Sequence, residues 1–455
     1  MYSIPAFMHG LLRRLVDVRR EETGAALFAF AYFFCLLSSY YLLRPLRDAM
    51  GLVGGAGQLK WLFTATFIAM LALVPVFGAI ATRWPPRKFV PVIYRFFALN
   101  MLGFGILFAN GFQEIAVSRV FFVWISVYNL FVVSIFWSVL ADCFRNKQGR
   151  RLYGFIAAGG TLGALIGPAL AASLVVKFGV AILTVLAALL LELAVRCFRQ
   201  LHDATHAAGA NEPHAAGPAI PDKTIGGGLF SGIVLILRER YLLAIVVYML
   251  LQTFMATFLY FEQGRIVAAS LADTASRTQL FATADLAVSC LTIVLQFFVT
   301  ARFIRYFGLA AAMALLPVAA VIAFTAIALW PTLFALVAAQ SIRRASEYAI
   351  ARPGREVLFT VVSREAKYKA KSVIETVVYR GGDALGGWLF ALVAAAGAGI
   401  AGLALLSLPL AAVSVWLSAW LARRQETLAA RQEAGRSTSA PAEPAPATAA
   451  ENRSM

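Results

Sequence analysis

Apolar runs of about 20 residues recur along the whole chain, and they constrain the fold more than any other feature of the sequence. A run of that length crosses a hydrocarbon layer roughly 30 Å thick as a single helix. The composition agrees, because 61% of the residues are hydrophobic and 14% are charged, against about 45–50% and about 25% in soluble domains. The runs also lack the period-two alternation of a membrane β-barrel. We therefore predict an all-α polytopic membrane protein.

Twelve such runs can be delimited, and their arrangement predicts two halves of six transmembrane helices each. The runs cover 25–43, 59–80, 89–109, 118–140, 153–176, 178–196, 241–261, 279–300, 308–329, 332–350, 373–395 and 399–421. The first half, 25–198, follows a short cytoplasmic segment, 1–24, and the second half is 237–424. Residues 199–236 between them form a cytoplasmic linker, rich in Ala, Gly and Pro near its centre. Residues 425–455 are rich in Ala, Pro and Glu, which predicts a disordered tail.

The formal net charge of +17 has a simple explanation in a membrane protein. In a soluble chain this charge would indicate a nucleic-acid partner. Here the lysines and arginines lie mainly in short loops on one side of the predicted bundle, as the positive-inside rule requires of cytoplasmic loops. We therefore predict that both termini are cytoplasmic and that no nucleic-acid polymer binds. The basic N-terminus lacks a signal-peptide cleavage pattern, so the first span is predicted to stay as an anchor.

The two halves repeat each other in their loops. TRWPPRK follows the second span and ARFIRYFG the eighth, and a longer basic stretch precedes the fifth span and the eleventh. Two matching six-helix halves resemble the major facilitator superfamily, in which the substrate binds near the midplane and the halves rock around it. The GALIGP of the fifth span partly matches that superfamily as well. The spacing Gly159-xxx-Gly163-xxx-Gly167 independently predicts close helix packing.

Nothing in the chain indicates an enzyme or a resident cofactor. There is no phosphate-binding G-x-x-x-x-G-K-[ST] loop. All histidines lie outside the spans, so no Ser/His/Asp arrangement is predicted. The four cysteines are predicted to be free thiols, because none pairs in an external loop. His202 and His206 are spaced i, i+4 but lack a third ligand, so no metal site is predicted.

The stretch YYLLRPLRDAMGLVGGAGQLK, residues 40–60, ends the first apolar run in two guanidiniums and a carboxylate. Arg44 and Arg47 are three residues apart, so they share a face if the helix continues past Pro45. Facing a cavity, the two side chains would suit a phosphate or carboxylate through bidentate hydrogen bonds. Facing outward, they would reach toward lipid headgroups. The spacing leaves both interpretations open.

Few other charges fall within or next to the spans, where a charge at the bilayer centre costs at least about 2.5–3.5 kcal/mol. Glu262 ends the seventh span, at the place that corresponds to Arg44 in the first half. Asp285 lies well inside the eighth span, so it is either a proton-coupling group or the partner of an arginine. Arg380 and Asp383 lie one helical turn apart and can pair with each other. The carboxylates considered as coupling groups or charge partners are Asp48, Glu262, Asp285, Glu375 and Asp383.

Two stretches resemble the ATP/ADP translocase family of nucleotide transporters. The first reads L-R-x-x-(K/R)-D with a later Gly-Ala and Leu-Lys; its residues are Leu43, Arg44, Arg47, Asp48, Gly55, Ala56, Leu59 and Lys60. The second lies within 348–386; its matching residues are Tyr348, Pro353, Arg355, Glu356, Lys369, Ala370, Lys371 and Glu375. The resemblance implies a major facilitator fold in a bacterial inner membrane. It also implies exchange of a phosphorylated nucleotide, with Arg47 helping to bind phosphate.

The chain departs from that family at functional positions. The fourth span reads SVYNLFVVSIFW where the family has Glu-Leu-Trp, Glu347 replaces a lysine and Arg352 replaces an acidic residue. We therefore predict a secondary transporter of a nucleotide or of another phosphorylated or anionic small molecule, rather than a strict ATP/ADP exchanger. A proton-coupled transporter of a different organic solute, or a lipid-handling protein of the same fold, is the alternative. The candidate substrate-binding residues are Tyr40, Tyr41, Arg44, Arg47, Lys60 and Arg380.

Overall fold

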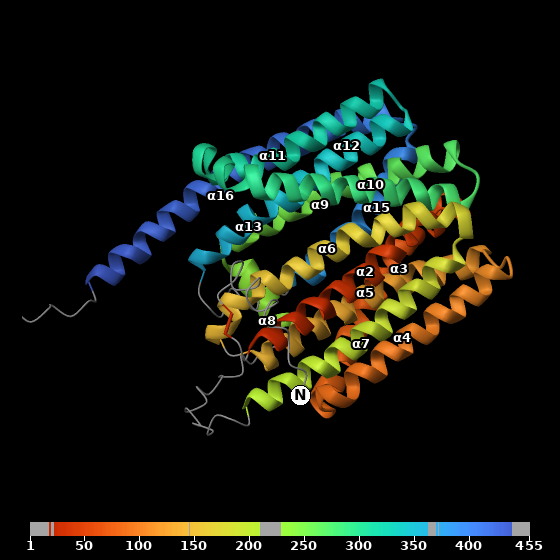
Figure 1. The fold of residues 1–455 in the computed structure, drawn as a ribbon. Helices are drawn as coiled ribbons and strands as arrows, with labels where there is room; N and C mark the ends of the chain where they lie inside the picture. The colour runs from red at the N-terminus through yellow and green to blue at the C-terminus, as the bar shows by residue number, and fades with distance from the viewer. Residues whose placement is uncertain are drawn as a thin grey trace, which may run out of the picture.

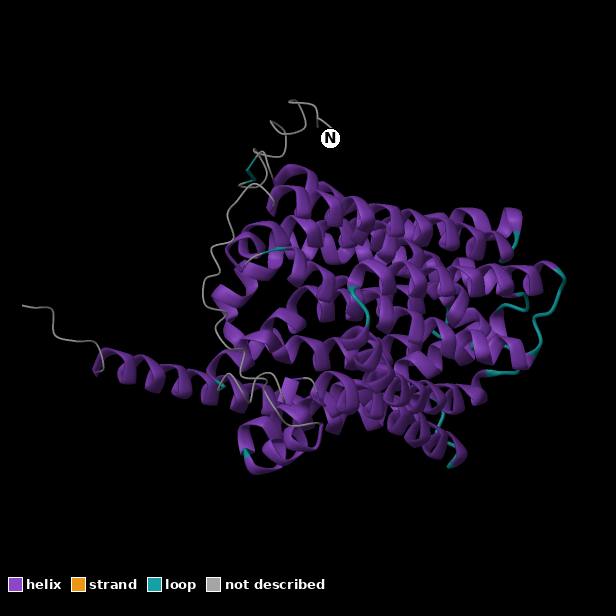
Figure 2. Ribbon diagram, turned by 90° about the horizontal axis from the view of Figure 1, so that it is seen from below, coloured by secondary structure: helices purple, strands orange, loops and turns teal. Residues whose placement is uncertain are grey.

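The computed structural model describes residues 18–19, 22–144, 146–209, 229–362, 370–371 and 373–438. These ranges are almost entirely helical and contain no strand, as Figure 2 shows. A membrane protein favours this arrangement because the hydrocarbon offers no hydrogen-bond partner, and a helix satisfies its own backbone groups. The all-α polytopic fold predicted from the sequence is confirmed.

The helices form two bundles that lie side by side (Figure 1). The first bundle contains α2 (Thr23–Met50), α3 (Leu59–Arg83), α4 (Pro86–Ala109), α5 (Ile115–Cys143), α6 (Asn146–Phe178) and α7 (Ala181–Gly209). The second half contains α8 (Leu229–Arg238), α9 (Arg240–Ser270), α10 (Thr274–Leu295), α11 (Ala301–Leu329), α12 (Leu333–Ser346), α13 (Arg352–Leu358), α15 (Tyr379–Ala395) and α16 (Ile400–Thr438). Three π-helical turns interrupt the second half: η3 (Gln296–Thr300), η4 (Glu347–Ala351) and η6 (Ile374–Val378). Short 3₁₀ turns are η2 (Ala56–Gln58) and η5 (Phe359–Val361).

Every predicted span falls on a helix of the structure. Within the described residues, nine stretches are long and apolar enough to cross a membrane, and one of them, 274–329, contains two predicted spans. The two other predicted spans fall on α12 and α15, which are shorter, at 14 and 17 residues, and carry arginines. Large apolar side chains lie on the outside of the bundles, among them Phe297 at 80% exposure and Phe334 at 84%. Such a surface suits lipid and would be costly in water.

Glycines let α6 lie directly on α2 at the centre of the first bundle. A Cβ on Gly163 would lie 2.7 Å from the carbonyl oxygen of Phe34. A Cβ on Gly167 would lie 2.9 Å from the amide nitrogen of Leu42. Only glycine leaves room for such backbone contact, so the small-residue spacing in this helix packs as predicted.

The predicted tail and linker need correction, because helices extend into both. The tail was predicted to be disordered from Gln425, but α16 continues to Thr438. Its residues 423–433 are mostly Ala, Arg, Gln and Glu, which favour helices, and Gln432 Nε2 donates to the Val361 carbonyl oxygen at 2.9 Å. In the linker, α7 runs to Gly209 and α8 begins at Leu229, so both ends of 199–236 are helical. Residues 210–228 and 439–455 lie outside the described residues.

Two further segments continue as helix where the sequence suggested a break. α2 passes through Pro45 and ends at Met50, so Arg44 and Arg47 stay on one helix. The predicted loop ARFIRYFG continues the helical path of α10 and η3, and the chain turns only at Gly308, which has a φ of 77°. Glycine accepts this backbone angle without the steric penalty of a side chain.

Candidate functional site

A cavity of about 1140 Å³ lies between the two bundles. Its wall combines α2, α3, α5 and α6 of the first half with α9, α10, α12, α13 and α15 of the second. Small-molecule sites commonly enclose about 300–1,000 Å³. The cavity is therefore large enough for a metabolite of nucleotide size.

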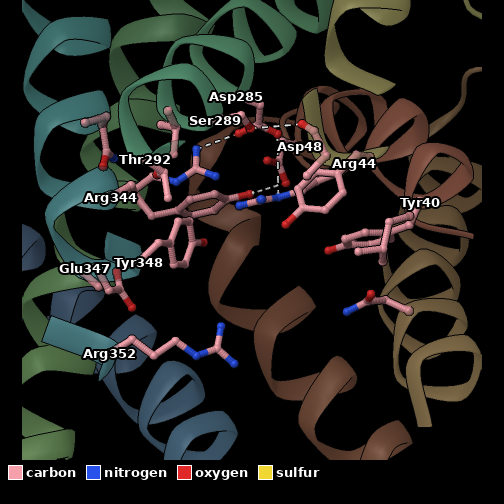
Figure 3. A pocket seen from close by; sticks show the side chains of 18 of the residues that line it. Tyr40, Arg44, Asp48, Asp285, Ser289, Thr292, Arg344, Glu347, Tyr348 and Arg352 are labelled. Atoms are coloured by element: carbon pink, nitrogen blue, oxygen red, sulfur yellow. Dashed lines mark hydrogen bonds and ion pairs between the residues drawn. The ribbon is translucent and has the colours of Figure 1, made fainter. Parts of the chain in front are cut away.

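Arg44 and Arg344 reach Asp285 from opposite sides of this cavity (Figure 3). The Arg344 Nη1 atom lies 2.6 Å from Asp285 Oδ1, and the Arg44 Nε atom lies 3.7 Å from Asp285 Oδ2. The carboxylate side chain is 3% exposed, and the arginine side chains are 16% exposed for Arg44 and 14% for Arg344. Arg44 belongs to the first half and the other two residues to the second, so this cluster joins the halves. Asp285 therefore has arginine partners, which is one of the two interpretations given for it above; a role in proton coupling stays a prediction.

A second cluster surrounds Asp48, one turn further along α2. Arg47 donates from Nη2 and Nε to Asp48 Oδ1, at 2.6 and 2.9 Å. The Tyr260 hydroxyl of α9 donates to the same oxygen at 2.9 Å. Asp48 therefore receives hydrogen bonds from both halves. The Arg44 and Arg47 side chains line the cavity instead of reaching outward to headgroups.

The cavity wall carries more positive than negative side chains, and tyrosines lie between them. The lining includes seven arginines and five carboxylates: Arg44, Arg47, Arg343, Arg344, Arg352, Arg355 and Arg380, with Asp48, Asp285, Glu347, Glu356 and Asp383. Five tyrosines also line it: Tyr40, Tyr41, Tyr260, Tyr348 and Tyr379. The guanidinium carbon of Arg44 lies 5.7 Å from the centre of the Tyr41 ring. Tyrosine offers an apolar face and a polar tip, so the wall can contact both an aromatic ring and an anionic group.

Arg380 and Asp383 form the pair that their spacing suggested. Arg380 Nη1 lies 3.5 Å from Asp383 Oδ2. Thr257 of α9 donates its hydroxyl to Asp383 Oδ1 at 3.3 Å. Both charged residues line the cavity, so this ion pair contributes to its wall.

Two predicted site residues lie outside the cavity wall. Lys60 Nζ lies 4.8 Å from the ring centre of Trp388, in a cation–π contact between the halves. Glu262 is buried and pairs with Arg265, whose Nη1 lies 3.1 Å from Glu262 Oε2. The Glu375 side chain lies outside the described side chains. Roles for these three residues in substrate binding or coupling stay predictions.

Arg344, which completes the central cluster, was not among the residues selected from the sequence, although it falls within the predicted span 332–350. In the structure, α12, η4 and α13 form one continuous helical path from Leu333 to Leu358. A π-helical turn inserts one extra residue and redirects the side chains around it, often at functional sites. Pro353 has no N–H for the Ala349 carbonyl, and the Thr300 hydroxyl donates to that oxygen instead, at 2.9 Å. The sequence did offer one indication that this segment belongs to the site, because Tyr348 and Pro353 are among the residues that match the second family-like stretch.

The halves are joined at the end of the bundle where α2 stops. Gln279 Nε2 donates to the Ala172 carbonyl at 3.2 Å, and Trp388 Nε1 donates to Thr64 Oγ1 at 3.0 Å. The rings of Trp61 and Trp388 also meet, with centroids 4.7 Å apart. In the opposite direction the cavity wall extends past the middle of α2 as far as Phe33. The structure is therefore a state in which the bundles close at the Met50 end of α2.

Other candidate chemistry finds little support in the described residues. No three His, Cys, Asp or Glu side chains there are placed to hold a metal ion. His202 stacks on Phe198, with ring centres 6.1 Å apart, and the side chain of His206 lies outside the described side chains. The four cysteines are free thiols, as predicted. Outside the spans, Asp273 caps α10 by accepting from the Ser276 N–H at 2.7 Å, and this bonding lowers the pKa of Asp273.

Comparison with known proteins gives a consistent result. The family model described as Major Facilitator Superfamily matches residues 23–272. The solved nucleoside transporter NupG is similar with a TM-score of 0.57 at 16% identity, over 89% of this chain and 98% of that chain. The POT family transporter PepTSo has a TM-score of 0.59 at 12% identity, over 89% of this chain and 98% of that chain. None of the curated proteins matches the chain in sequence. At such identities the solved structures show the fold alone.

Proposed function

The chain belongs to the major facilitator superfamily, and on that basis we propose that it is a secondary transporter of an anionic metabolite, a nucleotide or another phosphorylated compound. Transporters of this fold bind their solute near the midplane and rock two helix bundles around it. The cavity between the two bundles supports a site of this kind, because its wall takes side chains from both of them.

The observation that carries the proposal is the meeting of Arg44 and Arg344 at Asp285. One carboxylate faces two guanidiniums, so the cluster keeps an excess of one positive charge. Guanidiniums bind phosphate and carboxylate through parallel hydrogen bonds, and more strongly where water is scarce. The surplus of arginines in the wall extends the same preference across the cavity.

Asp285 would act as the internal counterion of the empty state. A phosphate that enters would bind the same two guanidiniums and repel the carboxylate. Because Arg44 and Arg344 belong to different halves, a bound anion would favour the conformations in which both can reach it. A ligand shifts a conformational equilibrium only through such differential contacts. The Tyr260–Asp48 hydrogen bond would then break when the closed end opens.

A nucleotide is the substrate that fits the remaining features. The family-like stretches supply Arg44, Arg47 and Tyr348, all of which line the cavity. The five tyrosines add aromatic surface for a base, next to arginines for the phosphates. We place the protein in a bacterial inner membrane with both termini in the cytoplasm, because the basic loops gather on that side.

Thermal-shift measurements on the purified protein test the proposal. A ligand at 100 times its Kd stabilises the protein by about 2.7 kcal/mol. Nucleotides and phosphate esters should include at least one that raises the melting temperature, while its unphosphorylated counterpart does not. The variant Arg344→Gln should lose this response, and the control Arg305→Gln, an exposed position outside the cavity wall, should keep it. Stabilisation by uncharged compounds alone would contradict an anion site.

A further inference from the structure

A second, strongly basic pocket of about 680 Å³ lies where α3 ends, α4 begins and α7 passes. Five cations and a tryptophan line it: Arg83, Arg87, Lys88, Arg95, Arg199 and Trp84. TRWPPRK, singled out above as a repeated loop, supplies four of these six residues. The transport cavity does not use any of them.

Two of these five cations form ion pairs with carboxylates, and the other three do not. Arg95 makes a two-pronged contact with Glu192, with N–O distances of 3.0 and 2.9 Å. Arg87 pairs more loosely with Asp203, at 3.6 Å. The other three cations, Arg83, Lys88 and Arg199, form no ion pair in the part of the chain that the structure describes, and Arg199 acts on Glu192 only from a longer distance. Because five cations face the two carboxylates of Glu192 and Asp203, the pocket keeps an excess of three positive charges.

The start of α4 adds a further preference for anions. The helix begins with Pro85 as its cap and Pro86 inside it, and no side chain caps its first turn. Pro86 has no N–H and the Lys88 N–H donates to the Pro85 carbonyl oxygen at 2.9 Å, so the Arg87 N–H and the helix dipole remain to attract negative charge. By itself a helix start would not define a site, but here it opens into the basic pocket.

An apolar track leads from the pocket along the outside of the bundle. Val92 lines the pocket and is 54% exposed. Phe96 and Leu99 follow at helical spacing on the same face, with 58% and 68% exposure. Trp84, 51% exposed at the mouth, is the residue type that gathers at the membrane–water boundary. A ligand that fits both parts needs an anionic head and an apolar tail.

We infer that this pocket binds the phosphodiester headgroup of an anionic phospholipid, with the acyl chains lying along the Val92–Leu99 face of α4. Basic pockets between transmembrane helices suit such headgroups. The positive-inside rule alone would require cations on this side of the membrane, but not their convergence into one concave site beside an apolar track. The lipid would bind the ends of α3, α4 and α7, and so only the first half.

Native mass spectrometry of the detergent-purified full chain tests the inference. The protein would be titrated with phosphatidylglycerol and with phosphatidylcholine of the same acyl chains. The test variant Arg83→Gln/Lys88→Gln/Arg199→Gln removes the three unpaired cations of the pocket. The control Arg305→Gln/Arg423→Gln/Arg424→Gln removes as much charge from exposed positions that line neither pocket. Thermal melting of both variants checks that they fold.

Phosphatidylglycerol should bind the wild type with an affinity at least about tenfold above that of phosphatidylcholine, and the pocket variant should lose that preference while the control variant keeps it. Equal loss in the two variants, or equal binding of the two lipids by the wild type, would overturn the inference. Inorganic phosphate and glycerol phosphate form a further arm. If either competes as well as the lipid at equal concentration, the apolar track contributes nothing and the ligand is a soluble phosphate.

Discussion

Replacing Asp285 with asparagine should destabilise the empty protein and make its stability depend on added anions. The substitution keeps the shape of the side chain but removes the charge that faces Arg344 at 2.6 Å and Arg44 at 3.7 Å. Removing one partner of a buried ion pair costs about 3–5 kcal/mol, because the other charge stays buried and unpaired. Both arginines are slightly exposed to the cavity, at 16% and 14%. We therefore expect the lower value, about 3 kcal/mol.

Tryptophan fluorescence during heating, with and without inorganic phosphate, provides the assay. For a chain of this size, a loss of about 3 kcal/mol in the free energy of unfolding lowers the melting temperature by roughly 3–6 °C. Phosphate should recover most of that fall in Asp285→Asn, because it occupies the place of the missing charge, and should affect the wild type less. The control Asp142→Asn makes the same change at an exposed position with no ion pair among the described residues. It should melt as the wild type does.

Two results would refute this reasoning. The first is a melting temperature of Asp285→Asn that equals that of the wild type. The second is a phosphate response of equal size in both proteins. The double variant Asp285→Asn/Arg344→Gln adds an internal check. It should melt above Asp285→Asn alone, because the second change removes a charge that the first left unpaired.

Three further outcomes follow from single contacts. Tyr260→Phe removes the 2.9 Å hydrogen bond to Asp48 and should destabilise the conformation closed at the Met50 end by about 1 kcal/mol. The distribution of distances between spin labels placed across that end should broaden. An unchanged distribution would contradict a role of this hydrogen bond in keeping that end closed. Gly163→Ala would press a methyl group against a backbone oxygen at 2.7 Å and cost about 1–3 kcal/mol. Gly154→Ala meets nothing within 4 Å and should melt normally, so equal melting of the two variants would contradict the packing. Asp273→Ala removes a helix cap and should cost at most about 1 kcal/mol at pH 7. Because the folded state lowers the pKa of Asp273, its contribution to stability is fully present above the ordinary value of about 3.9 and decreases as the pH falls through the lowered value. A difference from the wild type that does not shrink as the pH is lowered would contradict this.

The helical layout could be predicted because it depends on local properties of the chain. Length and hydropathy decide which segments cross a membrane, and each predicted span falls on a helix. The errors occur where a helix continues past charged residues. The tail after Gln425 continues α16, and the segment before Gly308, which contains Arg302 and Arg305, continues the helical path before it.

Part of the site could be predicted from each half of the chain, because Arg44, Arg47, Asp285, Arg380 and Asp383 all line the cavity. Arg44 and Arg47 were identifiable because two arginines at helical spacing are unusual at the end of an apolar run. Their partners depend on the packing of distant helices, which no periodicity encodes. Arg344 lies just before a π-helical turn that the sequence does not announce, and Tyr260 reaches Asp48 across 212 positions of the chain. Asp285 could be recognised as a buried carboxylate, but identifying its arginine partners required the position of Arg344.

Uptake into liposomes that contain the purified protein measures the proposed activity itself. Labelled nucleotides and phosphate esters would be supplied outside vesicles preloaded with the same compounds, and empty vesicles would give the background. The wild type should accumulate at least one phosphorylated compound above that background. Arg44→Gln and Arg344→Gln should each reduce its uptake by at least about tenfold, as the loss of a charge-assisted hydrogen bond of about 1.5–3 kcal/mol requires, while Arg305→Gln should transport normally. Uptake of a phosphorylated compound that is unchanged in both cavity variants, or uptake restricted to uncharged solutes, would contradict an anion transporter built around these two arginines.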